Sequence, residues 1–169
     1  MTAPCVRRHR TTHRGSAALC ARKMQPTLSM ILDCAGCRTP NRVPAARISA
    51  HARCGQCKAA LCPPERPLAL HSEADFDELV RESPIPVVVD FWAAWCGPCR
   101  AVAPELETLA RARTRGAIVA KVDTEALPSI ASRFAIRSIP TIVLFRNGSE
   151  AKRVSGAMSA DSIARGLAL

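Results

Sequence analysis

Hydrophobic and polar positions divide this chain of 169 residues into two parts near residue 66. From residue 67 onward, short apolar runs alternate with stretches in which apolar residues recur every three or four positions. The first pattern is typical of strands and the second of helices. Residues 30–62 contain few large apolar side chains, and residues 1–29 show no periodicity. The pattern predicts an α/β domain over residues 67–169, preceded by a small module at 30–62, a proline-rich linker at 63–66 and an N-terminal extension.

The alternating segments predict the element order βαβαβαββα. The expected strands are residues 67–72, 84–93, 117–123, 141–145 and 149–156, and the expected helices are residues 72–82, 96–115, 127–134 and 160–169. The almost continuous apolar run at 84–93 is typical of a strand buried on both faces, whereas 67–72 is expected at an edge. Asn147-Gly148 is a strong hairpin signal. The order predicts a mixed sheet, parallel at first and ending in an antiparallel hairpin, with helices on both faces.

The formal net charge of +10 lies upstream of the α/β domain. Residues 1–29 carry six basic residues and no acid, residues 30–66 carry six basic and two acidic, and residues 67–169 carry twelve of each sign. The domain is neutral, so it lacks the positive field that steers proteins to nucleic acid. No apolar stretch approaches the ~18–20 residues of a membrane-spanning helix, so no membrane partner is expected.

The basic extension allows two readings. It has the arginine-rich, acid-free character of an organelle transit peptide if it is present as a disordered extension, but we favour the reading that Met24 or Met30 is the true start and that the tail is seldom or never translated.

Nine cysteines are many for a chain of this length. Two C-x-x-C pairs lie upstream, a third lies in the sequence WCGPC, and three cysteines stand alone. In chain order these are Cys34, Cys37, Cys54 and Cys57, then Cys96 and Cys99, and the single residues Cys5, Cys20 and Cys62. An odd total with unpaired thiols argues against a secreted disulfide framework and favours a reducing compartment.

Cys96 is expected at the N-terminus of the helix that follows the buried strand. Unpaired backbone N–H groups and the helix dipole favour negative charge there, so the thiolate, which is the nucleophilic form, is favoured. Cys99 lies one turn further along the same side, and Gly97 and Pro98 keep that first turn tight. The spacing therefore predicts an attacking and a resolving thiol. A metal half-site and a structural disulfide are the alternatives.

The upstream cysteines fit the C-x₂-C-x₁₅₋₂₀-C-x₂-C spacing of a zinc ribbon. We expect Cys34, Cys37, Cys54 and Cys57 to hold structural Zn²⁺, in two turns that Gly36 and Gly55 permit. Four thiolates around Zn²⁺ leave a charge of −2, which neighbouring basic residues can offset; these are Arg38, Arg42, Arg53 and Lys58. Without metal, so small a module is hardly expected to fold. Two disulfides, iron or a second redox centre are the alternatives.

The sequences FWAAWCGPC, DFW, AKVD, SIPT and NG, in this order, resemble the thioredoxin family over residues 67–169. With the cysteine-rich module, residues 30–169 are similar to the zinc-binding second thioredoxin of bacteria. The resemblance implies a thioredoxin fold, with three layers α/β/α around a mixed central sheet, and a zinc-ribbon-like module before it. It further implies that Cys96 attacks a target disulfide and that Cys99 releases the reduced target.

The same resemblance assigns other site residues. Asp90 matches the family's buried acid, whose pKa burial would raise and which would take the Cys99 proton, and Lys121 matches the lysine near that acid. The alternative is that Asp90 is only a satisfied core carboxylate. Pro140, after Ile139, matches the family's cis-proline beside the active sulfurs, where extended substrates pair with main-chain groups. The substrate-binding surface implied by the match comprises Trp95, Gly97, Pro98, Ile139, Pro140 and Gly156.

The resemblance implies a cytoplasmic protein-disulfide reductase that acts on oxidised protein substrates and is itself reduced by an NADPH-dependent thioredoxin reductase. We expect a monomer without an organic cofactor. One alternative keeps the fold but makes the protein an oxidase or isomerase, although the Gly-Pro dipeptide resembles the reducing members. Another makes the zinc module a nucleic-acid or protein binding element, but residues 31–62 contain no aromatic side chain for base stacking.

Overall fold

The computed structural model describes residues 29–48, 52–61, 63–113 and 116–169. Its main sheet has five strands in the order β3-β5-β4-β6-β7. Their bounds are β3 Leu68–Leu70, β4 Val87–Trp92, β5 Ile118–Asp123, β6 Thr141–Arg146 and β7 Ser149–Ser155. β3 and β4 pair parallel with β5, whereas β6 pairs antiparallel with β4 and with β7. The sheet is therefore mixed, its first predicted strand lies at an edge, and its last two strands form the predicted hairpin.

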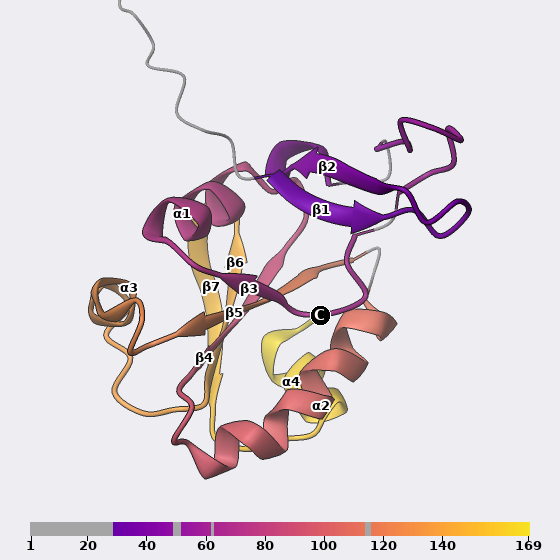
Figure 1. Cartoon of the computed structure of the whole chain (residues 1–169). Helices are drawn as coiled ribbons and strands as arrows, with labels where there is room; N and C mark the ends of the chain where they lie inside the picture. The colour runs from indigo at the N-terminus through magenta and orange to yellow at the C-terminus, as the bar shows by residue number, and fades with distance from the viewer. Residues whose placement is uncertain (1–28, 49–51, 62, 114–115) are drawn as a thin grey trace, which may run out of the picture.

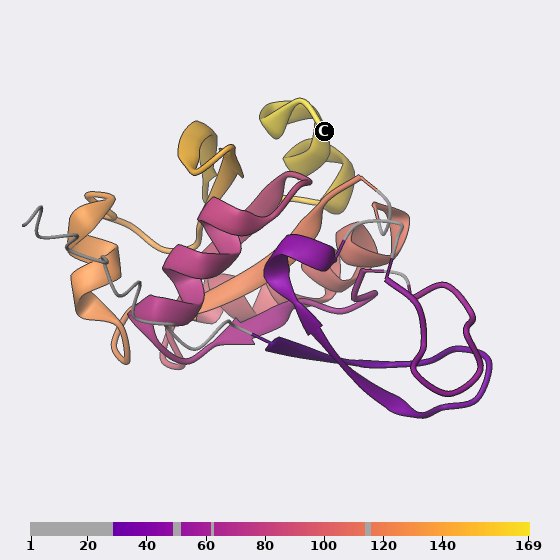
Figure 2. The ribbon, with the colours of Figure 1, turned by 90° about the horizontal axis from the view of Figure 1, so that it is seen from above.

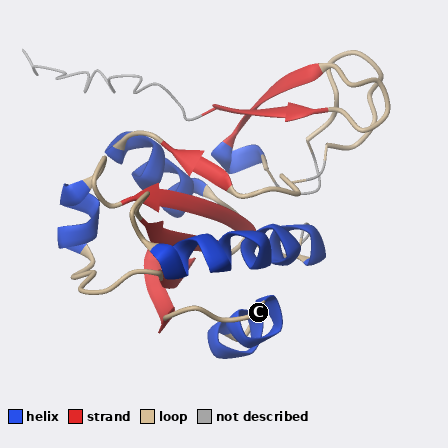
Figure 3. Ribbon diagram, turned by 60° about the horizontal axis from the view of Figure 1, so that its bottom comes forward, coloured by secondary structure: helices blue, strands red, loops and turns tan. Residues whose placement is uncertain are grey.

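Helices cover both faces of this sheet, as Figure 3 shows. Their bounds are α1 Glu73–Glu82, α2 Gly97–Ala112, α3 Pro128–Arg133 and α4 Ala160–Leu167. Buried residues of α1 and α3 share one apolar cluster, and those of α2 and α4 share the other. The chain therefore has the predicted three-layer α/β/α fold, and each helix lies within the range that the sequence predicted for it.

Local signals explain where the helices begin. The side chain of Ser72 accepts a hydrogen bond from the N–H of Asp75, and the side chain of Ser159 accepts one from the N–H of Ser162. Each bond satisfies a backbone donor that the first turn of a helix leaves unpaired. α2 continues through Pro104, so this proline lies inside the helix and does not end it.

The buried strand β4 alternates between the two layers. Val87, Val89 and Phe91 face the layer of α1 and α3, whereas Val88 faces the layer of α2 and α4. Asp90 has the same parity as Val88 and therefore lies on the face that α2 covers. The four phenylalanines of the chain pack against one another on the other face, with ring centroids 5.1–6.5 Å apart; they are Phe76, Phe91, Phe134 and Phe145.

The upstream module contains structure that the sequence did not predict. β1 (Ser29–Asp33) and β2 (Pro40–Pro44) form an antiparallel pair, followed by the 3-10 turn η1 (Ala45–Arg47), which lies against α1. Its large buried aliphatic side chains belong to the same cluster as Phe76 and Leu79 of α1; they are Leu32, Val43, Ile48 and Leu61. Figures 1 and 2 show the module on the α1 side of the sheet. Most of the large apolar residues described in the module are therefore buried against the larger domain, whereas Ile31 on β1 is exposed.

Glu105 of α2 joins the two helices of its layer. Its Oε2 accepts a hydrogen bond of 2.7 Å from the N–H of Ala160, the first residue of α4. A carboxylate there pairs a free backbone donor and favours the positive end of the helix dipole. We expect Glu105→Ala to lower the free energy of unfolding by about 1 kcal/mol, which thermal denaturation would register as about 2–4 °C in Tm.

Glu107 provides the matched control on the same helix. It is exposed and forms an i,i+4 ion pair with Arg111, 2.9 Å long, so Glu107→Ala should cost no more than about 0.5 kcal/mol. Equal losses of stability in the two variants would contradict the capping role of Glu105.

Candidate active site and metal centre

The WCGPC segment lies where β4 ends and α2 begins, at the bottom of the molecule in Figure 1. Cys96 is the N-cap of α2, and its Sγ accepts a hydrogen bond of 3.1 Å from the N–H of Cys99. Cys96 and Cys99 are joined by a disulfide and are both buried. Gly97 and Pro98 form the exposed first turn between them. The helix start therefore directs a backbone donor at the Cys96 sulfur, which favours negative charge on it.

A second segment lies against the same sulfur. The peptide bond between Ile139 and Pro140 is cis, as the family resemblance implied, and the carbonyl oxygen of Ile139 lies 3.7 Å from the Sγ of Cys96. The N–H of Gly156 donates a hydrogen bond of 2.9 Å to the carbonyl of Pro140. Gly156 has a φ of +96°, a conformation that favours glycine. Three of the predicted substrate-binding residues, from two chain segments joined by this hydrogen bond, therefore lie together, with Ile139 next to the Cys96 sulfur.

Asp90 is a buried acid on β4, on the face that α2 covers. The carboxylate is 1 % exposed, and its Oδ1 has no hydrogen-bond partner among the described residues. Burial raises the pKa of Asp90 to about 7, and the positive charge of Lys121 partly opposes this rise. Lys121 is its direct neighbour on β5, and the Lys121 ammonium lies 4.4 Å from the ring centroid of Trp92. A carboxyl with a pKa near 7 can both accept and return a proton at neutral pH.

The raised pKa of Asp90 makes stability depend on pH. Because the folded-state pKa of about 7 exceeds the unfolded value near 4, the folded state binds this proton more tightly. The associated stability is fully present below about pH 4 and is lost as the pH rises through 7. We expect Asp90→Asn to raise the free energy of unfolding at pH 8 by up to about 4 kcal/mol, and to change it little at pH 4.

Urea denaturation at pH 4, 6 and 8 measures this difference. Asp33→Asn is the matched control, because Asp33 is exposed on β1, and its effect should stay within about 0.5 kcal/mol at each pH. A stabilisation by Asp90→Asn that did not change with pH would contradict the buried-acid assignment.

Trp95, which directly precedes Cys96, is exposed, with 66 % of its surface accessible. Its indole Nε1 donates a hydrogen bond of 2.9 Å to Oε1 of Glu125, in the turn after β5. Glu125 was not among the predicted site residues. One indication of its role was available in the sequence, because Glu125 lies just beyond the end of β5, which pairs with β4. Residues that follow the carboxyl ends of neighbouring parallel strands lie close together.

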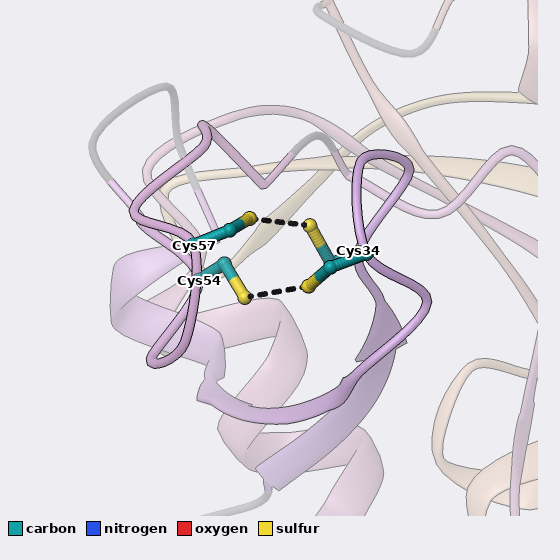
Figure 4. A group of neighbouring side chains, drawn as sticks. Cys34, Cys54 and Cys57 are labelled. Carbon is teal, nitrogen blue, oxygen red and sulfur yellow. Dashed lines mark hydrogen bonds between the residues drawn. The ribbon is translucent and has the colours of Figure 1, made fainter.

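The four upstream cysteines converge as predicted. Their Sγ atoms all lie within 4.8 Å of one another, and the pairs Cys34–Cys57 and Cys37–Cys54 are 3.5 and 3.6 Å apart. Figure 4 shows the two loops facing each other with their sulfurs turned inward. Four sulfurs at about 2.3 Å from a tetrahedral Zn²⁺ would be about 3.8 Å apart, so the cluster fits that ion.

The two C-x-x-C loops have the same backbone geometry, offset by 20 residues. In the first, the N–H of Arg38 bonds to the carbonyl of Cys34, and the N–H of Cys34 bonds to the carbonyl of Thr39. Residues Cys54, Lys58 and Ala59 repeat this pattern. The left-handed residues are Arg38, with φ 57°, and Lys58, with φ 62°. The expectation that Gly36 and Gly55 permit these turns is therefore wrong, because neither adopts a positive φ.

The electrostatics of the cluster call for a cation. A backbone N–H of Cys57 is the largest of several influences that lower the pKa of Cys54, to about 6. For Cys57, the N–H of Ala59 lowers the pKa, but the adjacent sulfurs of Cys34 and Cys37 outweigh it and raise the pKa to about 12. The thiolate form is therefore favoured at Cys54 and opposed at Cys57, because four negatively charged sulfurs so close together repel one another. A divalent metal removes that conflict.

The two cysteine sites lie at opposite ends of the molecule, since the module lies at the top of Figure 1 and the start of α2 at the bottom. Cys5, Cys20 and Cys62 lie outside the described residues. Among the helices that the structure describes, none is long and apolar enough to cross a membrane.

Comparison with known proteins agrees with both parts of the chain. Residues 67–168 match the family model Thioredoxin, and residues 34–59 match the model described as Thioredoxin 2, N-terminal, a zinc ribbon. Thioredoxin C-3 of Corynebacterium nephridii is 43% identical over 129 residues, which are 76% of this chain and 87% of that protein. Thioredoxin 1 of Synechococcus elongatus is 46% identical over 96 residues, 57% of this chain and 90% of that protein.

Among solved structures, a mutant thioredoxin from Halobacterium salinarum NRC-1 matches with a TM-score of 0.56 and 34% identity, covering 63% of this chain and 96% of that chain. Fold, dithiol motif and sequence similarity agree over the larger domain, and the cysteine-rich module matches separately. The chain therefore belongs to the thioredoxin family of thiol-disulfide oxidoreductases and carries the N-terminal zinc-ribbon domain of second thioredoxins.

Proposed function

We propose that this protein is a protein-disulfide reductase in which Cys96 attacks and Cys99 resolves. The observation that carries the proposal is the position of Cys96 at the N-cap of α2, with the N–H of Cys99 donating to its sulfur and the Ile139 carbonyl 3.7 Å away. One sulfur is thus stabilised as an anion, beside a backbone edge that an extended substrate can approach.

The reaction would proceed in two exchanges. The Cys96 thiolate attacks one sulfur of the substrate disulfide, forming a mixed disulfide and releasing the other substrate sulfur as a thiolate. Asp90 then accepts the proton of Cys99, and the Cys99 sulfur attacks Cys96. This forms the Cys96–Cys99 disulfide and releases the second substrate thiol. The proton role of Asp90 is supported by its burial and its pKa of about 7, and Lys121 moderates that value.

The substrate surface would consist of exposed and main-chain groups around the two sulfurs. Support comes from the exposure of Trp95, Gly97 and Pro98, and from the hydrogen bond between Gly156 and Pro140 next to the Ile139 carbonyl. Such a surface selects substrates by an accessible disulfide and an extended backbone. Oxidised proteins are therefore the expected substrates.

Each turnover leaves the dithiol oxidised, so a two-electron reductant must restore it. We propose an NADPH-dependent thioredoxin reductase, which family membership supports. The many cysteines outside the redox pair suit a reducing compartment, and we therefore propose a cytoplasmic location.

Cys34, Cys37, Cys54 and Cys57 would hold a structural Zn²⁺. This is supported by their convergence within 4.8 Å, their paired turns and the match of residues 34–59 to a zinc ribbon. The ion would neutralise thiolate charge and link the two loops. Cys34 and Cys54 are buried in the cluster shared with α1, so the metal would also fix the module on the larger domain. We propose residues 30–62 and 67–169 as the two structural units.

A redox titration against glutathione distinguishes reductase from oxidase. We expect a reduction potential of about −270 mV, the value typical of thioredoxin. A potential of about −120 mV would identify the protein as an oxidant and would overturn the reductase proposal.

A further inference from the structure

Three arginines of the upstream module surround one hollow on its surface. Arg42 lies on β2, Arg47 ends η1 and Arg53 precedes the second C-x-x-C loop. Together with four small or apolar residues they line a cavity of about 600 Å³; the others are Val43, Pro44, Ala46 and Ala52. Arginines from three separate backbone segments therefore line one volume in the range of small-ligand sites.

These arginines have no carboxylate partner within the described part of the chain. The ion pairs found there all lie in the larger domain, and the lining of the cavity contains no acidic residue. With the residues that the structure describes, the three arginines make one side-chain hydrogen bond, from Arg53 Nη1 to the carbonyl of Lys58. Like charges around one hollow repel each other, so an anion bound among them is favoured electrostatically.

The cavity that the three arginines line is distinct from the hollow beside the cysteine cluster. Arg38 and Lys58 directly follow Cys37 and Cys57, and Arg53 directly precedes Cys54. The cavity lining, by contrast, includes no cysteine, whereas the neighbouring hollow that Arg38 lines includes Cys34. Arg42 and Arg53, which were expected to offset the thiolate charge, also line this cavity together with Arg47.

The residues around the cavity limit the kind of anion that it can bind. Residues 29–61 contain no Phe, Trp or Tyr, so a nucleobase would find no ring on which to stack. A peptide strand could not extend β2 well either. Pro40, Arg42 and Pro44 are alternate residues of β2, so their backbone nitrogens lie along the same edge of the strand. Two of these three residues are prolines, which have no N–H to donate to an added strand. The cavity therefore suits a compact anion with several charged oxygens. Phosphate is such a group, and its oxygens can accept two parallel hydrogen bonds from a planar guanidinium.

We propose that Arg42, Arg47 and Arg53 form a binding site for a compact oligophosphate, either free or as the phosphate chain of a nucleotide. The site lies at the opposite end of the molecule from the dithiol and is independent of the redox chemistry (Figure 1). Its ligand is held by the charged oxygens alone.

Isothermal titration of the full-length, zinc-loaded protein with pyrophosphate tests the site. We expect saturable binding at constant ionic strength. Arg42→Gln and Arg47→Gln should each weaken it at least about tenfold, the effect of losing a charge-assisted contact. Neither arginine makes a side-chain hydrogen bond among the described residues, so these variants should fold. Their zinc content and insulin reduction should match those of the unchanged protein.

Two control variants test whether losing any positive charge on the protein, inside or outside the cavity, weakens binding equally. Lys152→Gln on β7 and Arg38→Gln in the module remove the same charge outside the cavity and should change the affinity by no more than about twofold. ADP should bind within about threefold of pyrophosphate, because no ring contacts its base.

Absence of saturable binding, or equal weakening in all four variants, would overturn the proposal. Tighter binding of ADP than of pyrophosphate by about tenfold or more would overturn the exclusion of a base-binding site. Tighter binding of an octaglutamate peptide or a single-stranded oligonucleotide would overturn the ligand class. Loss of insulin reduction alone would count against the redox assignment and leave this site intact.

Discussion

Replacing Cys96 with serine is expected to lower the rate of insulin reduction more than about 100-fold, because it removes the nucleophile that begins the exchange. Cys99→Ser should be equally inactive in turnover for a different reason. Its Cys96 remains stabilised by the start of α2 and attacks, but no second thiol releases the target. We therefore expect Cys99→Ser, and not Cys96→Ser, to accumulate covalent adducts with substrate.

Insulin turbidity measures the turnover, and non-reducing electrophoresis followed by mass spectrometry detects the adducts. Both variants should retain one Zn²⁺ per chain, which shows that the module and the fold are intact. Adducts on Cys99 in the Cys96→Ser variant would reverse the assigned roles. Substantial turnover by either variant would remove the dithiol from the centre of the reaction.

Removal of the metal should have the second large effect. Cys54→Ser is expected to reduce zinc content from about one ion per chain to below about 0.1, because the buried Cys54 sulfur is one of four that converge. The module buries Leu32, Val43 and Ile48 in the cluster shared with α1, so its loosening should expose part of that core. We expect a loss of stability on the order of 3 kcal/mol, or about 10 °C in Tm.

The same variant should keep most of its insulin-reduction activity, since the dithiol lies at the other end of the sheet (Figure 1). Inductively coupled plasma spectrometry, thermal denaturation and the insulin assay measure the three quantities. An exposed serine control is Ser149→Ala on β7, which should change none of them. Full zinc retention by Cys54→Ser would contradict the ligand assignment, and unchanged stability would contradict the structural role of the metal.

The elements of the larger domain could be predicted because its local signals agree with its tertiary packing. The run of valines in β4 is buried on both faces, Ser72 and Ser159 cap the helices that follow them, and the Asn147-Gly148 turn joins β6 to β7. The position of Cys96 at a helix start followed from the same pattern. Where a feature depends on neighbours along the chain, the sequence was sufficient.

Features that depend on distant neighbours were missed. Leu32, Val43, Ile48 and Leu61 lie in four short segments with no common period, so their burial against α1 left no pattern to detect. The contact of Glu125 with Trp95 spans 30 residues and joins two turns.

The turns of the metal module show a third reason. Glycine is the usual residue at positive φ, so the sequence directed attention to the glycines inside the C-x-x-C loops. The structure instead places the residue after each pair, Arg38 and Lys58, in that conformation. Backbone hydrogen bonds from these residues to Cys34 and Cys54 hold the turns, and such bonds are not visible in residue types.

The proposed reaction depends on the sulfur of Cys96 being stabilised as a thiolate at the N-terminus of α2. Its most direct test is the rate of iodoacetamide alkylation at pH 7, resolved by residue with mass spectrometry on the reduced, zinc-loaded protein. Cys96 should react at least about tenfold faster than Cys99 and than the cysteine of an unstructured peptide. A rate for Cys96 no greater than that of the peptide would contradict the proposed chemistry.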